Sequence, residues 1–340
     1  MRIGLLTTSF PRHPGDYAGS FVGDRATQLV ADGHDVDVLA AGLAAQDPAQ
    51  HPGIAGVSVT RLPCGANLFY GAGAPESLET GGAAWLSAVA FTASLAATAR
   101  ARAPAWDLIE SHWLVPCAFA ASAAAPDHPR RAWAHSGDVA LLERIPFGRA
   151  VAQRLARDGT DLRFVTSALW ARFAALAGAT VGTVEPLLVP ANLFAPAPRP
   201  DPAARARLGL VRPTVLAVGR LVPIKGHERL LRAVAAARVS PVEVVILGDG
   251  PERERLRDLA GQLGVALRLP GFVPRPEVAV WMRAADLFAL PSIRLPNGRT
   301  EGAPTTLREA QAIGVPTVAS ADPNELARAI HALLPSAPDM

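Results

Sequence analysis

A short segment, VGRLVPIKG, carries Arg220 and Lys225 directly after an apolar run that is typical of a β-strand. Lys225 is the only lysine among 33 basic residues, so the bias that favours arginine elsewhere has not removed it here. A compact ammonium and a planar guanidinium often bind phosphate together. We therefore predict a phosphate site in this loop, with a surface lysine left by chance as the alternative.

Glu301 and Glu309 frame the segment EGAPTTLRE, in which Pro304 stands where a helix would begin. The backbone amides of the first helical turn, Thr305–Leu307, could hold a diphosphate because they are free at a helix N-terminus. Carboxylates beside a phosphate are best explained by hydroxyl partners, such as those of ribose or another sugar. The alternative is that Glu309 is an ordinary exposed helix residue.

His135, in AHSGDV, follows another predicted strand, and Asp138 behind it could cap a helix. Such a histidine would face a ligand at the strand end, although a structural histidine is the more common case. Gly15 and Gly19, in HPGDYAGSFVGDR, would let backbone amides approach an anion. A tight turn also needs glycine, so a plain turn stays open as the alternative.

Several classes of protein are disfavoured. The sequence lacks G-x-G-x-x-G after its first predicted strand and lacks G-x-x-x-x-G-K-[ST], which argues against a classical NAD enzyme and a P-loop NTPase. Asp35 and Asp37 match a D-x-D metal pattern, but strand alternation explains them better. With 2 cysteines, no Cys/His cluster of zinc spacing and a net charge of +3, we expect a cytoplasmic protein without a zinc site or a nucleic-acid partner.

Strand and helix patterns alternate along all 340 residues, which predicts parallel sheets built from βαβ units. The proline-rich segment ANLFAPAPRPDP interrupts this alternation, so we expect two doubly wound domains at 1–195 and 203–340, with the site in the cleft between them. The predicted strands are Ile3–Thr8, Asp35–Ala40, Val57–Leu62, Leu108–Ser111, Arg131–Ala134, Leu162–Thr166, Thr183–Val189, Thr214–Val218, Val242–Leu247, Ala266–Leu269, Leu287–Leu290 and Thr317–Ala319.

Two segments bear on membrane contact. The uncharged stretch Gly81–Ala99 is long enough to span a bilayer, but its alanine, serine, threonine and glycine content favours a buried helix of the fold. The segment ERIPFGRAVAQRLARD predicts a basic amphipathic face that could rest on the inner face of an anionic membrane, with an ordinary surface helix as the alternative. This face comprises Arg144, Ile145, Phe147, Arg149, Val151, Arg154, Leu155 and Arg157.

Through most of its length the chain resembles the family 4 retaining glycosyltransferases, of the glycosyltransferase group 1 type. The resemblance rests on AGSFV, SHWLVP, HSGDV, VGRLVPIKGHERLL, ILGDGPERERL, LPGFV, ADLFALPS and, above all, EGAPTTLREA as the E-x7-E motif. It implies the GT-B fold, with two Rossmann-like domains. It also implies metal-independent transfer of a hexose from a nucleotide diphosphate sugar to a glycan or lipid-linked acceptor, as in polysaccharide biosynthesis.

The resemblance further implies roles for the matching positions. Arg220 and Lys225 would bind the donor diphosphate, Glu309 the ribose, and Glu301 would face the donor sugar. The backbone of Gly271–Val273 would meet the base, the loop at Gly19 would close over the phosphates and sugar, and His135 would contact the transferred sugar. The predicted catalytic residues are His135, Glu301, Arg220 and Lys225. The predicted donor-binding residues are Gly19, Arg220, Lys225, Gly271, Phe272, Val273, Glu301, Thr305, Thr306, Leu307 and Glu309.

Two segments depart from the family pattern. After TVAS the family continues into a glycine-rich loop, whereas here Ser320 runs directly into ADPNELARAIHALL. LLVPANLF also lacks the glycine and aspartate that the family shows after its proline. These departures leave open a nucleotide-sugar-binding protein that has lost catalysis. A further alternative is a sugar-nucleotide epimerase, which shares the two-domain fold.

Overall fold

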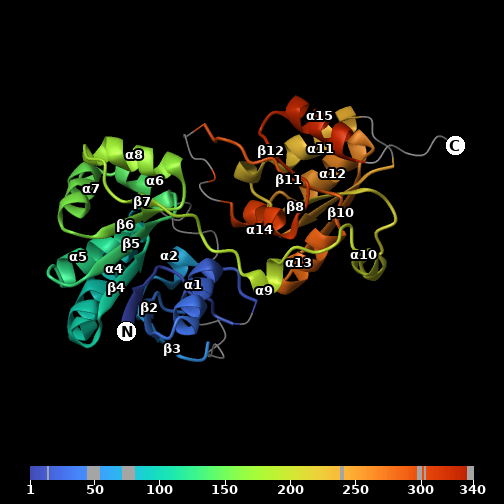
Figure 1. Cartoon of the computed structure of the whole chain (residues 1–340). Helices are drawn as coiled ribbons and strands as arrows, with labels where there is room; N and C mark the ends of the chain where they lie inside the picture. The colour runs from blue at the N-terminus through green and yellow to red at the C-terminus, as the bar shows by residue number, and fades with distance from the viewer. Residues whose placement is uncertain are drawn as a thin grey trace. The chain divides into compact units, whose positions relative to one another are not determined.

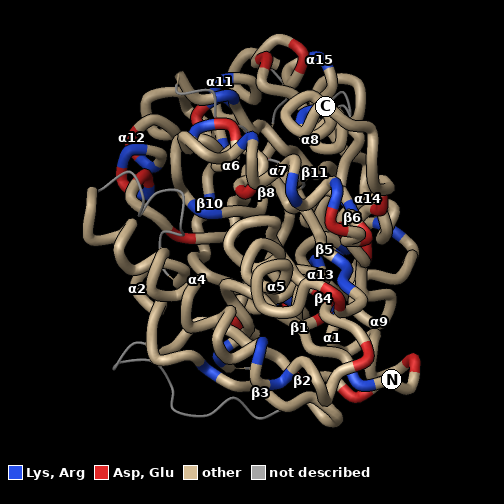
Figure 2. Tube along the Cα trace, turned by 90° about the vertical axis from the view of Figure 1, so that its left-hand side faces the viewer, with Lys and Arg blue, Asp and Glu red and all other residues tan. Residues whose placement is uncertain are grey.

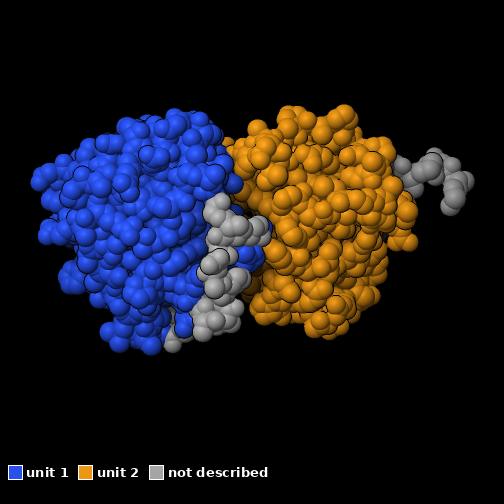
Figure 3. Space-filling model, turned by 90° about the horizontal axis from the view of Figure 1, so that it is seen from below, with its two compact units in different colours: residues 1–188 blue, residues 189–340 orange. Residues whose placement is uncertain are grey.

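A computed structural model describes residues 1–13, 15–43, 54–70, 81–237, 241–296, 301 and 304–334. The chain divides into two compact units, Met1–Leu188 and Val189–Met340 (Figure 3). This division lies upstream of the predicted domain limits of 1–195 and 203–340. Phe194, which the predicted limits place in the first domain, is buried in a core of the second unit, and this packing moves the division toward the N-terminus.

Unit 1 is built on a seven-stranded parallel sheet in the order β3-β2-β1-β4-β5-β6-β7 (Figure 1). Its strands are β1 (Arg2–Leu6), β2 (Asp35–Ala40), β3 (Val57–Arg61), β4 (Leu108–His112), β5 (Arg130–Ala134), β6 (Asp161–Phe164) and β7 (Thr183–Val184). Its helices are α1 (Ser20–Ala31), α2 (Ala66–Phe69), α4 (Gly82–Arg102), α5 (Phe119–Ala124), α6 (Gly137–Arg144), α7 (Gly148–Arg157) and α8 (Ser167–Ala177), with short helical turns η1 (Ala103–Ala105) and η2 (Leu114–Ala118).

Unit 2 is built on a five-stranded parallel sheet in the order β10-β9-β8-β11-β12. Its strands are β8 (Thr214–Val218), β9 (Glu243–Leu247), β10 (Ala266–Gly271), β11 (Leu287–Leu290) and β12 (Thr317–Ala319). Its helices are α9 (Ala191–Phe194), α10 (Pro202–Leu208), α11 (His227–Ala237), α12 (Arg253–Leu263), α13 (Arg275–Ala284), α14 (Thr305–Ile313) and α15 (Pro323–Leu333), with a helical turn η3 (Pro223–Lys225).

Strand alternation divides the core of unit 2 between the two faces of its sheet. Val215 and Ala217 of β8 pack with α11, α12 and α15, whereas Leu216 between them packs with α9, α10, α13 and α14. Helices therefore cover both faces, as a doubly wound sheet requires. All twelve predicted strands occur, and the predicted two-domain Rossmann-like α/β fold is confirmed.

The order of the strands reverses once in each sheet, between β1 and β4 in unit 1 and between β8 and β11 in unit 2. In open parallel sheets, ligands bind beyond the carboxyl ends of the strands at this point. His112 ends β4 in unit 1, and the segment that carries Arg220 and Lys225 follows β8 in unit 2. The fold thus places predicted functional segments at the expected edge of each sheet.

Helix α4 differs from the prediction of a buried helix. Phe91, Leu95 and Ala99 are buried, but Leu86 is 74% exposed and Val89 is 65% exposed, because only one side of the helix packs on the sheet and α5. Within the described residues, Gly82–Ala105 is long and apolar enough to cross a membrane, with a mean hydropathy of 1.4.

Charged residues are mixed rather than segregated on the surface helices. Figure 2 shows acidic and basic positions next to one another on α12. Among them, Arg257 pairs with Glu254, and Arg255 pairs with both Glu252 and Glu228 of α11. Such exposed pairs contribute little to stability, about 0–1 kcal/mol each.

Candidate active site

The loop between β8 and α11 brings Lys225 and Glu301 together. The Nζ atom of Lys225 donates to Oε1 of Glu301, and Oγ of Ser292 donates to Oε2 of the same carboxylate. Both members of the ion pair are mostly buried, with side chains 17% exposed. Two residues 76 positions apart in the sequence are therefore direct neighbours, as a shared site requires.

Glycines make this loop compact. Gly226 has φ +65°, and a Cβ atom there would lie 2.0 Å from the carbonyl oxygen of Pro291. A Cβ on Gly219 would lie 3.0 Å from Cε of Lys225, so this glycine leaves room for the lysine stem. The sequence VGRLVPIKG thus folds against the end of β11, next to Ser292 and Glu301.

Arg220 is half-buried two residues beyond β8. Its carbonyl oxygen lies 3.3 Å from Nε2 of His227, the first residue of α11. Burial, together with the nearby Lys225 ammonium, lowers the pKa of His227 to about 4. His227 is therefore neutral at physiological pH and supports the loop without adding a charge to it.

Glu309 is 3% exposed, so the alternative of an ordinary exposed helix residue is wrong. Arg275, at the start of α13, donates from Nε and Nη2 to Oε1 of Glu309 over 3.0 Å and 2.5 Å. The sequence analysis missed Arg275, because nothing in its local pattern shows that it lies beside a carboxylate 34 residues away. This pair holds Glu309 in the first turns of α14.

The other predicted donor residues lie at neighbouring ends of the unit 2 elements. Thr305, Thr306 and Leu307 form the first turn of α14, where Pro304 supplies no side-chain cap. Gly271 ends β10, and its carbonyl oxygen accepts from the amide of Gly248, 2.8 Å away, just after β9. Phe272 is 50% exposed, whereas Val273 packs against the core that includes α13 and α14.

In unit 1, His135 lies beyond β5, but it is only 5% exposed. Its ring contacts Phe21 of α1, with 4.7 Å between ring centroids, and Trp113, with 4.8 Å. Burial lowers its pKa well below the ordinary value, and the neighbouring His112 lowers it further. His135 is therefore a neutral imidazole packed among aromatic rings.

Asp138 ties together the tips of β4 and β5. Its carboxylate accepts from the amides of Leu114, His135, Ser136 and Val139. Burial raises the pKa of Asp138, while these amide hydrogen bonds oppose that shift. Asp138 therefore does more than the predicted capping of its own helix, because its carboxylate also accepts from the amide of Leu114, just beyond the neighbouring strand β4.

Gly19 is required by the backbone. It has φ +70° and precedes α1, and a Cβ atom there would lie 2.3 Å from the carbonyl oxygen of Ser9. The turn thus explains this glycine, and its predicted contact with phosphate stays a prediction. Asp37 of the D-x-D pattern is buried and bonds to Arg102, Trp106 and Ser58, which supports the structural interpretation of that pattern.

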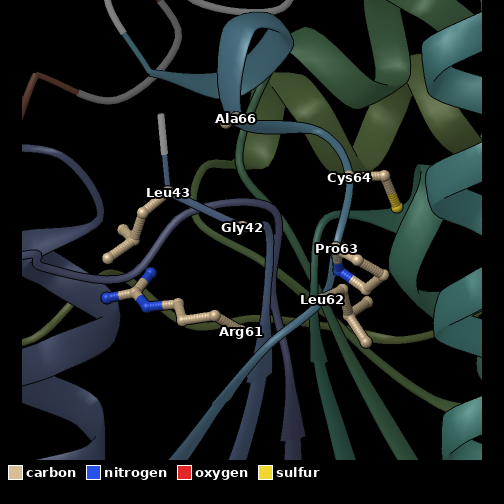
Figure 4. Close-up of a pocket in the computed structure, with 7 residues that line it drawn as sticks. All are labelled: Gly42, Leu43, Arg61, Leu62, Pro63, Cys64 and Ala66. Atoms are coloured by element: carbon tan, nitrogen blue, oxygen red, sulfur yellow. The ribbon is translucent and has the colours of Figure 1, made fainter. Parts of the chain in front are cut away.

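A separate pocket of about 390 Å³ lies beyond β2 and β3 in unit 1 (Figure 4). Arg61 lines it, but its guanidinium donates to the Tyr70 hydroxyl and to the carbonyl oxygens of Phe10 and Pro11. The guanidinium of Arg61 thus forms its hydrogen bonds within the protein. The lining residues are Gly42, Leu43, Arg61, Leu62, Pro63, Cys64 and Ala66.

Comparison with known proteins assigns the family. Residues 203–332 match the family model described as glycosyl transferases group 1. The chain is 31% identical over 345 residues, covering 94% of this chain and 80% of the relative, to a GDP-mannose-dependent alpha-(1-6)-phosphatidylinositol monomannoside mannosyltransferase of Mycobacterium tuberculosis. This chain belongs to the group 1 glycosyltransferases. It is also 32% identical to the D-inositol 3-phosphate glycosyltransferase of Kineococcus radiotolerans, covering 94% of this chain and 78% of the relative.

Solved structures agree on the fold of this glycosyltransferase. Sucrose-phosphate synthase from Thermosynechococcus elongatus is similar with a TM-score of 0.73 and 21% identity, covering 98% of this chain and 89% of that chain. HepE of Anabaena, solved in complex with UDP and glucose, is similar with a TM-score of 0.67 and 21% identity over the same shares. The fold is GT-B, as predicted from the family resemblance.

Proposed function

We propose that this glycosyltransferase moves a hexose from a nucleoside diphosphate sugar to a glycan or lipid-linked acceptor, with retention at the anomeric carbon and without a metal ion or other cofactor. The observation that carries the proposal is the Lys225–Glu301 pair at the carboxyl edge of the unit 2 sheet. An ammonium and a carboxylate side by side suit a ligand that carries both phosphate and hydroxyl groups.

In this proposal, the diphosphate takes the place of Glu301 as the partner of Lys225, which frees Glu301 to accept from a hydroxyl of the donor sugar. Arg220 and the amides of Thr305–Leu307 add positive charge around the leaving group. Fixed cations and a helix N-terminus can stabilise a departing diphosphate in the way that a metal ion does elsewhere. Glycosyl transfer then needs little covalent chemistry from the protein.

The remaining predicted residues recognise the rest of the donor. Glu309 would accept from the ribose hydroxyls, and its pairing with Arg275 fixes the position of its carboxylate. The backbone of Gly271–Val273 would meet the base, the loop at Gly19 would cover the phosphates, and His135 would contact the transferred sugar. GDP-mannose is the first donor to test, because the relative aligned over 94% of this chain carries that donor in its name.

Calorimetric titration of GDP, UDP and ADP tests the donor site. The wild type should bind one nucleotide tightly, and Lys225→Ala should weaken that binding about tenfold or more, as expected for the loss of a charge-assisted hydrogen bond. Arg257→Ala is the matched control, because it removes an exposed cation that pairs with Glu254 on the surface of α12. Equal affinity in wild type and Lys225→Ala would refute the site.

Turnover separates the transferase from the two alternatives. A transferase releases free nucleoside diphosphate only in step with a glycosylated acceptor, and NMR of the first product reports whether the anomeric configuration is retained. A binding protein gives no product. An epimerase converts the donor in the absence of an acceptor. Activity that persists in excess EDTA supports the proposed independence of metal.

We also propose that unit 1 rests on the cytoplasmic face of an anionic membrane. The predicted amphipathic face is smaller than expected, because Leu155 is buried and Arg154 donates to Ser122. Phe147, however, is 78% exposed between α6 and α7, and the neighbouring Arg149 is exposed as well. An apolar ring with adjacent cations suits an anionic lipid surface.

Co-sedimentation with phosphatidylglycerol vesicles tests this contact. Phe147→Ser should reduce salt-sensitive binding, whereas Val211→Ser, at a position 90% exposed in unit 2, should leave it unchanged. Absence of binding by the wild type would refute membrane contact without affecting the proposed transferase activity.

A further inference from the structure

Two buried histidines and a buried glutamate form a chain at the switch point of the unit 1 sheet. His112 ends β4, and its ring stacks on that of His135 with 5.1 Å between centroids and an angle of 10°. Nδ1 of His112 lies 3.0 Å from Nε2 of His135, so one of these nitrogens donates to the other. On the opposite side of His112, Nε2 lies 3.6 Å from Oε1 of Glu110.

Glu110 is fixed as an ionised carboxylate. Its side chain is fully buried, and Arg25 of α1 grips both oxygens, with Nε 2.7 Å from Oε1 and Nη2 2.9 Å from Oε2. Arg131 of β5 lies 3.6 Å from Oε2. Burial alone would raise the pKa of Glu110, yet the hydrogen bonds from Arg25 hold that pKa well below its ordinary value. The carboxylate can therefore only accept hydrogen bonds.

This fixed acceptor determines where the protons of both imidazoles lie. Nε2 of His112 lies 3.6 Å from this carboxylate, beyond ordinary hydrogen-bond distance, and it is the nitrogen of a neutral ring at which the negative charge favours the hydrogen. A neutral His112 then accepts at Nδ1, which requires the hydrogen of His135 to lie on Nε2.

We propose that Glu110 and His112 are positioning residues, anchored by Arg25, that hold His135 in its Nε2-protonated tautomer and so keep Nδ1 as a hydrogen-bond acceptor for a hydroxyl group of the bound sugar. Nδ1 of His135 is buried and has no hydrogen-bond partner in the part of the chain that the structure describes. The sugar contact rests on the proposed function, whereas the tautomer does not.

Among the residues that the structure describes, the ring contacts of His135 other than that with His112 are with aromatic side chains. Phe21 and Trp113 contact its ring through aromatic faces and edges, and Asp138 accepts from its backbone amide rather than from the imidazole. The ring is thus oriented by His112 on one side and by apolar packing elsewhere.

NMR of the full-length enzyme labelled with ¹⁵N-histidine tests the tautomer directly, without substrate. At neutral pH, His135 should show a protonated Nε2 and an unprotonated Nδ1. His112→Phe, which keeps a ring but removes its nitrogens, should allow a detectable Nδ1-protonated fraction, and so should Glu110→Gln, which replaces one acceptor oxygen by a donor. His34→Gln, at a partly exposed position, is the control and should leave the His135 signals unchanged.

Two results would overturn the inference: a wild-type His135 that is protonated on Nδ1, or a His135 tautomer that is identical in wild type and in both variants. Because Glu110→Gln disturbs a buried ion pair, its fold is checked by circular dichroism, and His112→Phe keeps the test valid if Glu110→Gln unfolds.

Binding measurements test the sugar contact. His112→Phe should weaken binding of the nucleotide sugar by about three- to tenfold, the effect of one hydrogen bond, and should leave binding of the free nucleoside diphosphate unchanged. Unchanged affinity for the nucleotide sugar in a variant with an altered tautomer would overturn the acceptor role. An enzyme with the expected tautomer that binds no nucleotide would instead refute the proposed function.

Discussion

His227 offers a test of how the phosphate loop is held, because replacing it by glutamine should remove a pH-dependent loss of stability from unit 2. The imidazole is 2% exposed, and burial together with Lys225 lowers its pKa to about 4. Its Nε2 faces the carbonyl oxygen of Arg220 at 3.3 Å. Glutamine is neutral at every pH in this range and can still donate to that carbonyl group.

The sign and size follow from proton linkage. In the unfolded chain, His227 binds a proton as the pH falls through about 6.5, whereas in the folded chain it stays unprotonated until the pH reaches about 4. The free energy of unfolding therefore falls in this interval and is unaffected by His227 above it. A difference of about 2.5 pKa units, at roughly 1.4 kcal/mol per unit, gives a loss of about 3 kcal/mol by pH 4.

The assay must report on unit 2 alone, since the lowered pKa of His135 gives unit 1 a loss of the same sign. Trp281 is the only tryptophan beyond residue 188 among the six in the chain. The ¹⁹F signal of Trp281 in 5-fluorotryptophan-labelled enzyme, assigned with Trp281→Phe and followed through urea titrations at several pH values, therefore isolates this unit.

Between about pH 7 and pH 4, the free energy of unfolding of unit 2 should fall in the wild type by most of the expected amount of about 3 kcal/mol. In His227→Gln, nearly all of this fall should be absent. His331→Gln, at an exposed position of α15 in the same unit, is the control and should behave as the wild type. The same pH dependence in wild type and His227→Gln would refute the argument that a neutral buried imidazole supports the loop.

Two further substitutions test the packing of the site. Arg275→Met leaves the buried Glu309 carboxylate without its guanidinium partner and should destabilise unit 2 by about 3 kcal/mol, measured from the same ¹⁹F signal. Adding Glu309→Gln should restore part of this loss, because it removes the buried charge. A double variant no more stable than the single variant would contradict this argument. Gly226→Ala places a Cβ 2.0 Å from a carbonyl oxygen. It should lower the free energy of unfolding by about 1–3 kcal/mol more than Gly264→Ala, at a glycine with a similar φ and open space around it. Equal urea midpoints for the two variants would disprove the steric argument.

The fold could be predicted from the sequence because buried parallel strands are short continuous apolar runs. Thr214–Val218 and Leu287–Leu290 have the same bounds in the sequence analysis and in the structure. Composition was less informative for α4, since alanine-rich helices suit a core and a surface equally well. Its burial depends on how far the sheet extends beneath it, and that is a property of tertiary structure.

Site residues in loops that follow strands could be predicted from the sequence. Site residues defined by side-chain contacts with residues distant in the sequence could not. VGRLVPIKG and EGAPTTLRE each stand out locally, and the structure joins them through Lys225 and Glu301. Arg25 and Glu110 are 85 residues apart and meet only because α1 packs beside the first strands. A glutamate inside the strand run LIESH gives no local sign of its partner.

Each unit keeps a buried, neutral imidazole close to a strand end, at His135 in unit 1 and His227 in unit 2. A neutral ring can orient a loop or a hydroxyl group without changing the charge that an anionic donor meets. Binding of the nucleoside diphosphate should therefore vary little between about pH 6 and pH 8 except through the ionisation of the phosphate itself, which calorimetry over that interval would measure.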